Sequence, residues 1–170
     1  MSGHHEIDNS QAIMLGLMQE CLKTELNINN ITSYFERDVG LCFKLFKFIN
    51  SGIFPLTQNV TSIKNALIYL GDTQTKKLIL LLTSGILATN KPKELTRLAI
   101  IRARFCELMA AKAMPEYAEA GFMVGLFSLL DAMLDKPLDN LLDDLPLAPE
   151  VHAALTSDKP SRLKYILNAV

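Results

Sequence analysis

Apolar residues recur at helical spacing along almost the whole chain, and this periodicity constrains the fold more than any other feature of the sequence. No stretch alternates between apolar and polar residues, as the sequence of a half-buried strand would. The sequence therefore predicts an all-α protein. The pattern is clearest in the segment 11–26, where the residues at helical spacing are Met14, Leu17, Met18, Cys21 and Leu22.

The predicted helices follow one another closely, and no segment between them resembles a domain linker or a repeat. Gly71 suits the end of one helix and Asp72 the start of the next, because glycine and aspartate favour those helix termini. The 170 residues are enough for one domain with a substantial core. We therefore expect a single-domain helical bundle over residues 11–170, preceded by a tail over residues 1–10 that is native or left over from cloning. The predicted helices span residues 11–26, 31–37, 41–50, 62–70, 72–88, 93–114 and 118–134, and short helices between prolines follow.

Composition and charge argue against several classes of function. A net charge of −1 gives no electrostatic basis for binding nucleic acid or an anionic membrane. The three cysteines, Cys21, Cys42 and Cys106, form no CxxC pair, so neither a disulfide framework nor a zinc site is expected. No secretory leader is recognisable, and the longest apolar run, residues 78–88, is shorter than the roughly 20 residues of a membrane-spanning helix. We therefore expect a cytoplasmic protein.

The sequence offers no recognisable catalytic or metal-binding constellation. His4 and His5 lie in the tail, and for His152 a half-buried or surface histidine is the plainer interpretation. Cys106 lies in an apolar stretch without a neighbouring histidine and is expected to be a small core residue. No nucleophile elbow, phosphate-binding loop or dinucleotide-binding glycine motif occurs. We therefore predict no catalytic residue, no metal and no cofactor.

Two charged residues lie where apolar residues are expected. Arg102 falls inside the apolar arc of the helix 93–114, and Asp131 is surrounded by apolar neighbours in the helix 118–134. Because a buried charge needs a partner, we predict that Arg102 and Asp131 form an internal ion pair, with Arg104 as the second choice for the cation. Recognition of a phosphate by these arginines is one alternative, and in another one of the two charges reaches water. The arc consists of Leu95, Leu98, Ile101, Phe105, Leu108 and Met109.

Small residues recur on one face of the helix 118–134. They are spaced so that they lie above one another along the helix. Such a stripe lets a second helix approach closely, and it explains a serine at this position without invoking catalysis. We therefore expect a packing face made of Gly121, Gly125, Ser128 and Ala132.

A resemblance to the HDOD family of bacterial signalling domains runs through residues 38–82, which are DVGLCFKLFKFINSGIFPLTQNVTSIKNALIYLGDTQTKKLILLL. The family pattern has an aspartate before a leucine-rich helix that ends in Asn-Ser, followed by a loop with phenylalanine. A Ser-Ile helix that ends in Leu-Gly comes next, and a further helix follows it. The matching residues are Asp38, Asn50-Ser51, Phe54, Ser62-Ile63 and Leu70-Gly71.

Two further segments resemble a narrower branch of this family, in which the HDOD domain follows an EAL domain of the cyclic-di-GMP phosphodiesterase type. The segments are RARFCELMA at residues 102–110 and FMVGLFSLLDAML at residues 122–134. The whole resemblance covers about residues 11–168 and implies a helical bundle of the HD-domain-like type. No EAL domain is present in this sequence, so any phosphodiesterase activity would belong to a separate domain.

The HDOD family is related to the metal-dependent HD phosphohydrolases, whose metal-binding helix has a pattern such as GLLHDIG. Aligned with residues 125–131, this pattern places its histidine at Ser128, its aspartate at Leu129 and its last glycine at Asp131. Leucine offers no donor atom, and serine is a poor substitute for imidazole. The resemblance therefore implies an HD-like scaffold that has lost its metal site and is not an enzyme.

The resemblance also implies a non-catalytic regulatory or protein-interaction module in bacterial cyclic-di-GMP signalling, with a protein or a tethered signalling domain as its partner. Lys44 and Lys47 mark one candidate interaction surface, and an ordinary solvated helix face is the alternative. Two other functions stay open. One is a nucleotide-sensing domain in which Arg97, Arg102 or Arg104 contacts phosphates, and the other is a degenerate metal-dependent phosphohydrolase. No feature of the sequence indicates an oligomeric state.

Overall fold

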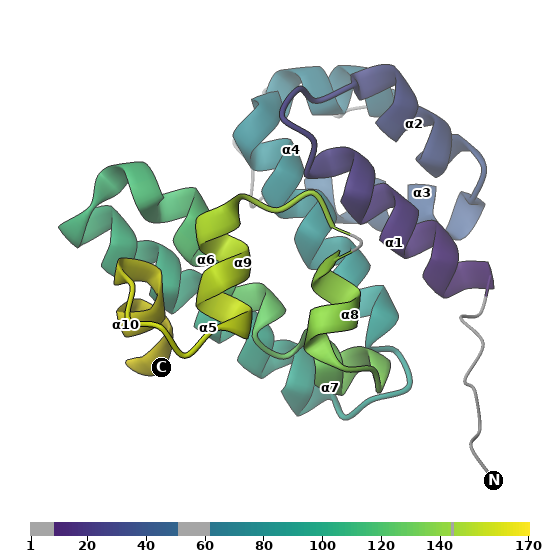
Figure 1. The fold of residues 1–170 in the computed structure, drawn as a ribbon. Coiled ribbons are helices and arrows are strands. Elements are labelled where there is room, and N and C mark those ends of the chain that lie inside the picture. The colour runs from purple at the N-terminus through teal and green to yellow at the C-terminus, as the bar shows by residue number, and fades with distance from the viewer. Residues whose placement is uncertain (1–8, 51–61, 144) are drawn as a thin grey trace, which may run out of the picture. The chain divides into compact units, whose positions relative to one another are not determined.

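The computed structural model describes residues 9–50, 62–143 and 145–170, and within these ranges every regular element is helical (Figure 1). The all-α fold class predicted from the sequence is therefore confirmed. None of the described helices is both long enough and apolar enough to cross a lipid bilayer. The chain divides into two compact units, residues 1–83 and residues 84–170.

The single domain over residues 11–170 stays a prediction from the sequence. The boundary between the units falls inside one long helix, α4 (Ile63–Leu87). The predicted tail, residues 1–10, lies outside the described residues as far as residue 8, and Ser51 and Phe54 of the family pattern also lie outside them.

The first unit is built from α1 (Asn9–Cys21), α2 (Ile28–Glu36), α3 (Val39–Ile49) and the larger part of α4. α2 contacts both α1 and α3. The side chains of Asn27 and Asp38 cap α2 and α3, because each accepts a hydrogen bond from the main-chain N–H three residues further on. The predicted helical spacing is confirmed, since the periodic residues are buried: Met14, Leu17, Met18, Cys21, Leu22, Leu41, Leu45 and Ile49.

The two halves of α4 meet at Gly71, whose backbone has φ 70° and ψ 171°. Glycine adopts this conformation far more readily than any other residue. The hydroxyl of the buried Thr75 donates a 3.1 Å hydrogen bond to the carbonyl oxygen of Leu67 and so links the two halves. The predicted boundary, with one helix ending at Gly71 and the next starting at Asp72, is therefore confirmed.

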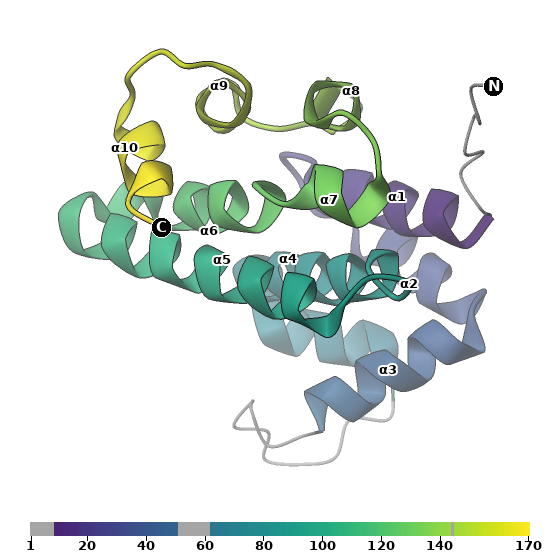
Figure 2. The ribbon, with the colours of Figure 1, turned by 90° about the horizontal axis from the view of Figure 1, so that it is seen from below.

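After the last turn of α4, the second unit continues with a long helix, α5 (Lys93–Ala113). A short 3-10 turn, η1 (Pro115–Tyr117), connects α5 to α6 (Ala118–Phe127). The shorter helices that follow are α7 (Leu130–Leu134), α8 (Leu138–Asp143), α9 (Pro149–Thr156) and α10 (Arg162–Asn168). Figure 2 shows α6 between α5 on one side and α9 on the other, and α6 contacts both. A buried apolar cluster joins α6 to α9 and α10, and its members are Val124, Val151, Ala154 and Leu163.

The prediction of one continuous helix over residues 118–134 is wrong. Ser128 is the C-terminal cap of α6, and Leu129 leaves the helical conformation with φ −121° and ψ 14°. α7 follows as a separate short helix. Because the break resets the helical register, Asp131 and Ala132 are exposed. The predicted stripe of small residues therefore ends at Ser128.

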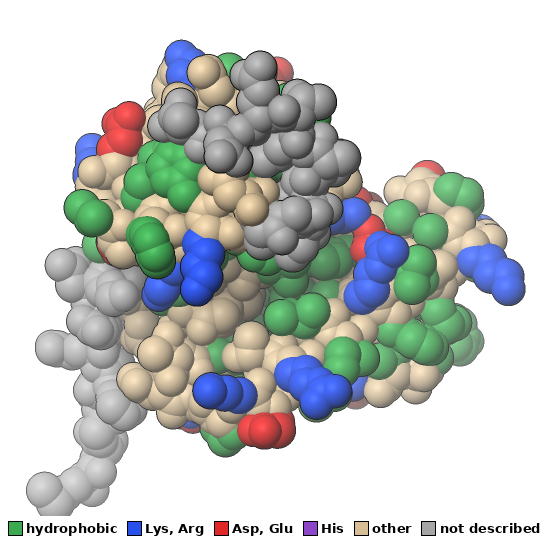
Figure 3. Space-filling view, turned by 180° about the vertical axis from the view of Figure 1, so that it is seen from behind, with side chains coloured by type: hydrophobic (Ala, Val, Ile, Leu, Met, Phe, Trp, Pro, Cys, Tyr) green, Lys and Arg blue, Asp and Glu red, His purple; other side chains and the backbone are tan. Residues whose placement is uncertain are grey.

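α5 buries the face opposite to the one predicted from its large apolar residues. Side chains of that predicted arc are exposed, namely Leu98, Ile101, Phe105, Leu108 and Met109. The buried face is made mostly of small side chains, namely Ala99, Ala103, Cys106, Glu107 and Ala110. The reason is the close approach of α6, which leaves room for only small side chains between the two helices. Hydrophobic side chains accordingly gather beside Lys and Arg on the outer surface of this region (Figure 3).

Candidate functional site at the α5–α6 helix pair

Two glycines of α6 bring its backbone close to the backbone of α5. A Cβ atom on Gly125 would meet the carbonyl oxygen of Arg102 and would lie only 2.7 Å from Cα of Ala103. A Cβ atom on Gly121 would lie 2.8 Å from the carbonyl oxygen of Cys106. These distances are shorter than real Cβ contacts, so no larger residue fits without moving a helix. The prediction that Gly121 and Gly125 form a packing face is confirmed.

Ser128 and Arg102 form a polar link between the same two helices. Ser128 Oγ donates a 2.8 Å hydrogen bond to the carbonyl oxygen of Gly125 and accepts a 2.9 Å hydrogen bond from Arg102 Nε. Arg102 Nη1 also donates to the main-chain oxygen of Val170, at 3.1 Å. The half-buried guanidinium thus joins α5 to the end of α6 and to residue 170.

The predicted ion pair between Arg102 and Asp131 is not formed, and Arg104 does not replace Arg102 in it. Asp131 is exposed because the break after α6 places it on the outer face of α7. Arg104 instead pairs with Glu107 of its own helix, at 2.7 Å. The prediction fails because it assumed one continuous helix with Asp131 on a buried face.

Replacing Ser128 with alanine is expected to lower the free energy of unfolding by about 1–2 kcal/mol, because Arg102 Nε loses its acceptor while the guanidinium stays half-buried. Asp131→Asn is the control, and we expect it to change the free energy of unfolding by less than about 0.5 kcal/mol. Urea unfolding followed by circular dichroism measures both variants. A larger loss for Asp131→Asn than for Ser128→Ala would show that the aspartate carries the link.

Cys106 is a core residue of the second unit. It is fully buried in a cluster with Ala110 and Ile166. Burial raises the pKa of the Cys106 thiol, and the positive charge of Arg102 opposes this rise only in part. A buried thiol with a raised pKa is a poor nucleophile. The predicted role of Cys106 as a small core residue is confirmed.

The histidines do not assemble a site within the described residues. Nε2 of His152, on α9, lies 3.3 Å from a carboxylate oxygen of Asp143, and the ring is partly exposed. His4 and His5 lie outside the described residues. Across the described ranges, no three His, Cys, Asp or Glu side chains lie close enough together to hold a metal ion.

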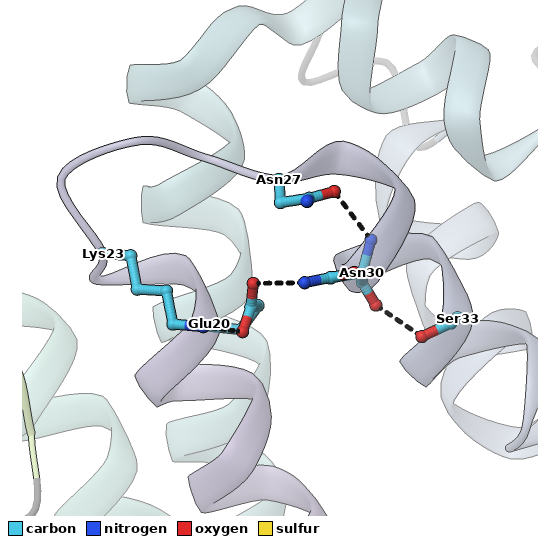
Figure 4. A network of polar contacts seen from close by, with 5 residues as sticks. All are labelled: Glu20, Lys23, Asn27, Asn30 and Ser33. Carbon is cyan, nitrogen blue, oxygen red and sulfur yellow. Dashed lines mark hydrogen bonds and ion pairs between the residues drawn. The ribbon is translucent and has the colours of Figure 1, made fainter.

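A polar network in the first unit was not predicted from the sequence. The carboxylate of Glu20, on α1, accepts hydrogen bonds from Lys23 Nζ and, at 2.9 Å, from Asn30 Nδ2 on α2 (Figure 4). These two donors hold the pKa of the Glu20 carboxyl below its ordinary value, against the opposing effect of burial. Glu20 and Lys23 are three residues apart, a spacing from which an ion pair between them could have been predicted. Asn30 joins it only through the packing of α2 on α1, so the network fixes two helices.

Lys44 and Lys47 are exposed on α3, as the helical periodicity predicts. The same helix exposes two apolar residues, Val39 and Phe43, to 84% and 67%. Exposed apolar side chains bordered by charges have the composition of an interface centre with its polar rim. Together these four residues are called the α3 surface.

A pocket beside the start of α5 is lined by three cationic side chains, Lys91, Lys93 and Arg97. The rest of its lining is Gly85, Ala88, Thr89, Thr96, Ile100 and Ile101. Lys91 is paired with Asp135. Lys93 and Arg97 make no ion pair with any residue in the described part of the chain. Sequence reasoning singled out Arg97 but did not place the two lysines beside it.

Comparison with known proteins places these features in a family. The HDOD domain family matches residues 9–133. The chain is 32% identical over 150 residues to the cyclic di-GMP phosphodiesterase CdgJ of Vibrio cholerae, a match that covers 88% of this chain and 35% of that protein. It is 34% identical over 142 residues to the uncharacterized protein YuxH of Bacillus subtilis, with 82% and 35% covered. The chain therefore spans about a third of the length of these curated relatives. No solved structure gives a significant match. With the family match extending over most of its length, this chain belongs to the HDOD domain family.

Proposed function

We propose that this chain is a non-catalytic regulatory module of bacterial cyclic-di-GMP signalling, which acts by binding a protein partner or a tethered domain. The observation that carries the proposal is the hydrogen bond between Ser128 and Arg102. Ser128 stands at the position of the metal-binding histidine in the HD pattern, and its hydroxyl links two helices. The next residue, Leu129, stands at the position of the aspartate and has no donor atom for a metal. Both substitutions support loss of the HD metal site.

The link to cyclic-di-GMP signalling is supported by the relative from Vibrio cholerae, which is named as a cyclic di-GMP phosphodiesterase. Because the match covers 35% of that relative, most of the relative lies outside the matched part. We infer that hydrolysis belongs to the unmatched part and that the matched part regulates it. We propose the same role for this chain, which would regulate hydrolysis carried out by a separate domain.

We propose further that the α3 surface contacts the partner. Its two lysines are exposed beside Phe43 and Val39, so binding would remove apolar surface from water while the ammonium groups stay at the rim. An anionic patch with an apolar centre is the complementary surface that this arrangement would recognise.

A chimera tests the proposal, with this chain in place of the matched segment of the Vibrio relative. We expect deletion of that segment to change the rate of cyclic-di-GMP hydrolysis several-fold, and we expect the chimera to return the rate toward that of the intact relative. The isolated chain should hydrolyse no cyclic-di-GMP with Mg²⁺, Mn²⁺ or Fe²⁺. Hydrolysis that is unaffected by the deletion would contradict a regulatory role.

Charge reversal tests the α3 surface in the same chimera. Lys44→Glu combined with Lys47→Glu is expected to abolish the effect of the inserted chain on hydrolysis. The matched control is Lys159→Glu combined with Arg162→Glu, which changes the net charge equally at exposed positions of the second unit. Equal losses in the two double variants would show that net charge, rather than the α3 surface, is responsible.

A second candidate function, nucleotide sensing, is favoured by the cation-lined pocket beside α5. Arg102 and Arg104 are held by other side chains, whereas Arg97 lines this pocket with Lys93. A guanidinium and an ammonium group side by side suit a phosphate. Calorimetry with cyclic-di-GMP separates the candidates, since the regulatory proposal predicts no saturable heat. Saturable heat that is lost in Lys93→Ala and Arg97→Ala would favour nucleotide sensing.

A further inference from the structure

An uncovered apolar row runs along the outer face of α5. Its four apolar members are between 43% and 51% exposed, although the opposite face of the same helix is buried against α6. Scattered exposed apolar residues are ordinary, but a continuous row on one helix marks an interaction surface. Figure 3 shows hydrophobic side chains with Lys and Arg beside them on the outer surface of this region. The row with its two charged ends is called the α5 stripe, and it consists of Glu94, Leu98, Ile101, Phe105, Leu108 and Lys112.

The spacing of the α5 stripe is that of a coiled-coil seam. Its members follow one another in alternating steps of four and three residues, which are the steps between the a and d positions of a heptad. Leu98 and Phe105 occupy a positions, and Ile101 and Leu108 occupy d positions. A seam of this kind is the surface along which one helix packs lengthwise on another helix.

We propose that the α5 stripe pairs with the α5 stripe of a second copy of this chain, with the two helices antiparallel. In this register Leu98 faces Leu108 of the second copy, and Ile101 faces Phe105 of the second copy. Each large apolar side chain then meets another one across a twofold axis at the level of residue 103, between Ile101 and Phe105 on the outer face of α5. The same surface serves both copies, as an isologous dimer requires.

The charges at the two ends of the α5 stripe select the antiparallel orientation. Glu94 of each copy faces Lys112 of the other, which gives two ion pairs per dimer. In a parallel pair Glu94 would face Glu94 and Lys112 would face Lys112, and both contacts would be repulsive. Within the described part of the chain, neither of these side chains has an ion-pair or hydrogen-bond partner, so both charges are free to pair between copies.

The arginines that border the α5 stripe are compatible with this pairing. Arg104 lies close to the twofold axis, and its charge is offset by Glu107 at 2.7 Å. The guanidinium of Arg102 donates to Ser128 on the buried side of the helix. Arg97 faces Ala111 of the second copy, which carries no charge.

The size of the α5 stripe sets the strength of the association. Specific protein interfaces bury about 1,200 Å² or more of total surface. Four apolar side chains from each copy bury an area near or below that lower limit. An interface of this size predicts a weak dimer, which forms at high protein concentration and dissociates on dilution. It also predicts sensitivity to salt, because the end pairs are exposed.

Sedimentation velocity of the whole chain over a range of concentrations tests the pairing. We expect the apparent mass to rise with concentration from 18.9 kDa toward twice that value. Phe105→Asp is expected to weaken association at least tenfold, because it places two carboxylates in the centre of the seam. The control is Tyr165→Asp, at a side chain that is 68% exposed on α10, and it should leave association unchanged. Circular dichroism confirms that each variant keeps its helices.

Charge reversal tests the register. Glu94→Lys and Lys112→Glu are each expected to weaken association several-fold at low salt, because each replaces two attractive pairs with two repulsive ones. The two substitutions in one chain should restore dimerisation. An equimolar mixture of the two single variants should also associate, since each copy then supplies the charge that the other needs.

Three results would overturn the proposal. A chain that stays monomeric at every concentration would rule out the dimer. Association that survives Phe105→Asp would place the contact on another surface. Association that neither single charge reversal weakens would exclude the antiparallel register. None of these results bears on the α3 surface or on the loss of the metal site, so this proposal and the proposed function can fail separately.

Discussion

Replacing Gly125 with alanine is expected to lower the free energy of unfolding by about 3 kcal/mol or more, at the upper end of the cost of overpacking a core. The added Cβ would meet the carbonyl group of Arg102, lying 2.6 Å from its carbon and 2.7 Å from Cα of Ala103. These are backbone atoms of a helix, so they cannot move aside as the tip of a side chain could. α5 and α6 would have to separate, and the polar link from Arg102 to Ser128 would stretch with them.

Gly85 provides the matched control for this substitution. It also lies in a helix, but a Cβ atom there would meet no atom within 4 Å. Gly85→Ala is therefore expected to stabilise the chain by about 0.4–1 kcal/mol, because alanine has less conformational entropy to lose on folding. Urea unfolding followed by circular dichroism measures both variants. Similar stabilities for Gly125→Ala and Gly85→Ala would contradict the close approach of α5 and α6.

Replacing Gly71 with alanine is expected to cost about 1–3 kcal/mol, and here the cause is the backbone rather than space. A Cβ atom at Gly71 would meet nothing within 4 Å, but φ 70° with ψ 171° is a conformation that essentially only glycine adopts. The kink is also held by the hydrogen bond from Thr75 to Leu67. Relaxing the strain by straightening α4 would therefore break a buried hydrogen bond.

Thermal unfolding of Gly71→Ala, again beside Gly85→Ala, measures the cost of this strain. The two glycines lie in the same helix and both have open space around them, so only the backbone conformation distinguishes them. A stability for Gly71→Ala equal to that of Gly85→Ala would mean that α4 does not need a glycine at its kink.

In the first unit, α1 and α3 could be predicted from the sequence because their apolar residues recur at helical spacing. In α1 and α3 the periodic residues, such as Met18 and Leu45, are buried, and Lys44 and Lys47 are exposed on the opposite side. The boundary at Gly71 was also predictable, because glycine is the residue that such a backbone conformation requires.

The buried face of α5 could not be predicted from the size of its apolar residues. The helix has two apolar faces, one with large residues such as Phe105 and one with small residues such as Ala103. Periodicity favours the larger residues, whereas the partner helix decides which face is buried. The signal was present in Gly121 and Gly125, since a glycine face demands a partner face made of small residues. Combining the two stripes would have predicted the observed packing.

The residues of the candidate site could be predicted from the sequence, but the hydrogen bond between them could not. The resemblance to the HD pattern singled out Ser128, and periodicity singled out Arg102. Their hydrogen bond depends on the end of α6 at Ser128, and neither a proline nor a polar cluster marks that end in the sequence. The same unmarked break left Asp131 exposed and made the predicted ion pair wrong. The end of α6 could therefore not be predicted from the sequence, because tertiary packing rather than a local sequence signal sets it.

The metal content of the purified chain tests the loss of the HD metal site most directly. The chain is incubated with Fe²⁺, Mn²⁺ or Mg²⁺ and dialysed, and its bound metal is then quantified by elemental mass spectrometry. A metal-binding HD phosphohydrolase treated in the same way is the positive control. We expect far less than one metal ion per chain and the same thermal stability with and without metal, because Ser128 is bound to Arg102 and Leu129 has no donor atom. One tightly held Fe, Mn or Mg ion per chain, together with a stability that rises on binding it, would contradict the loss of the site.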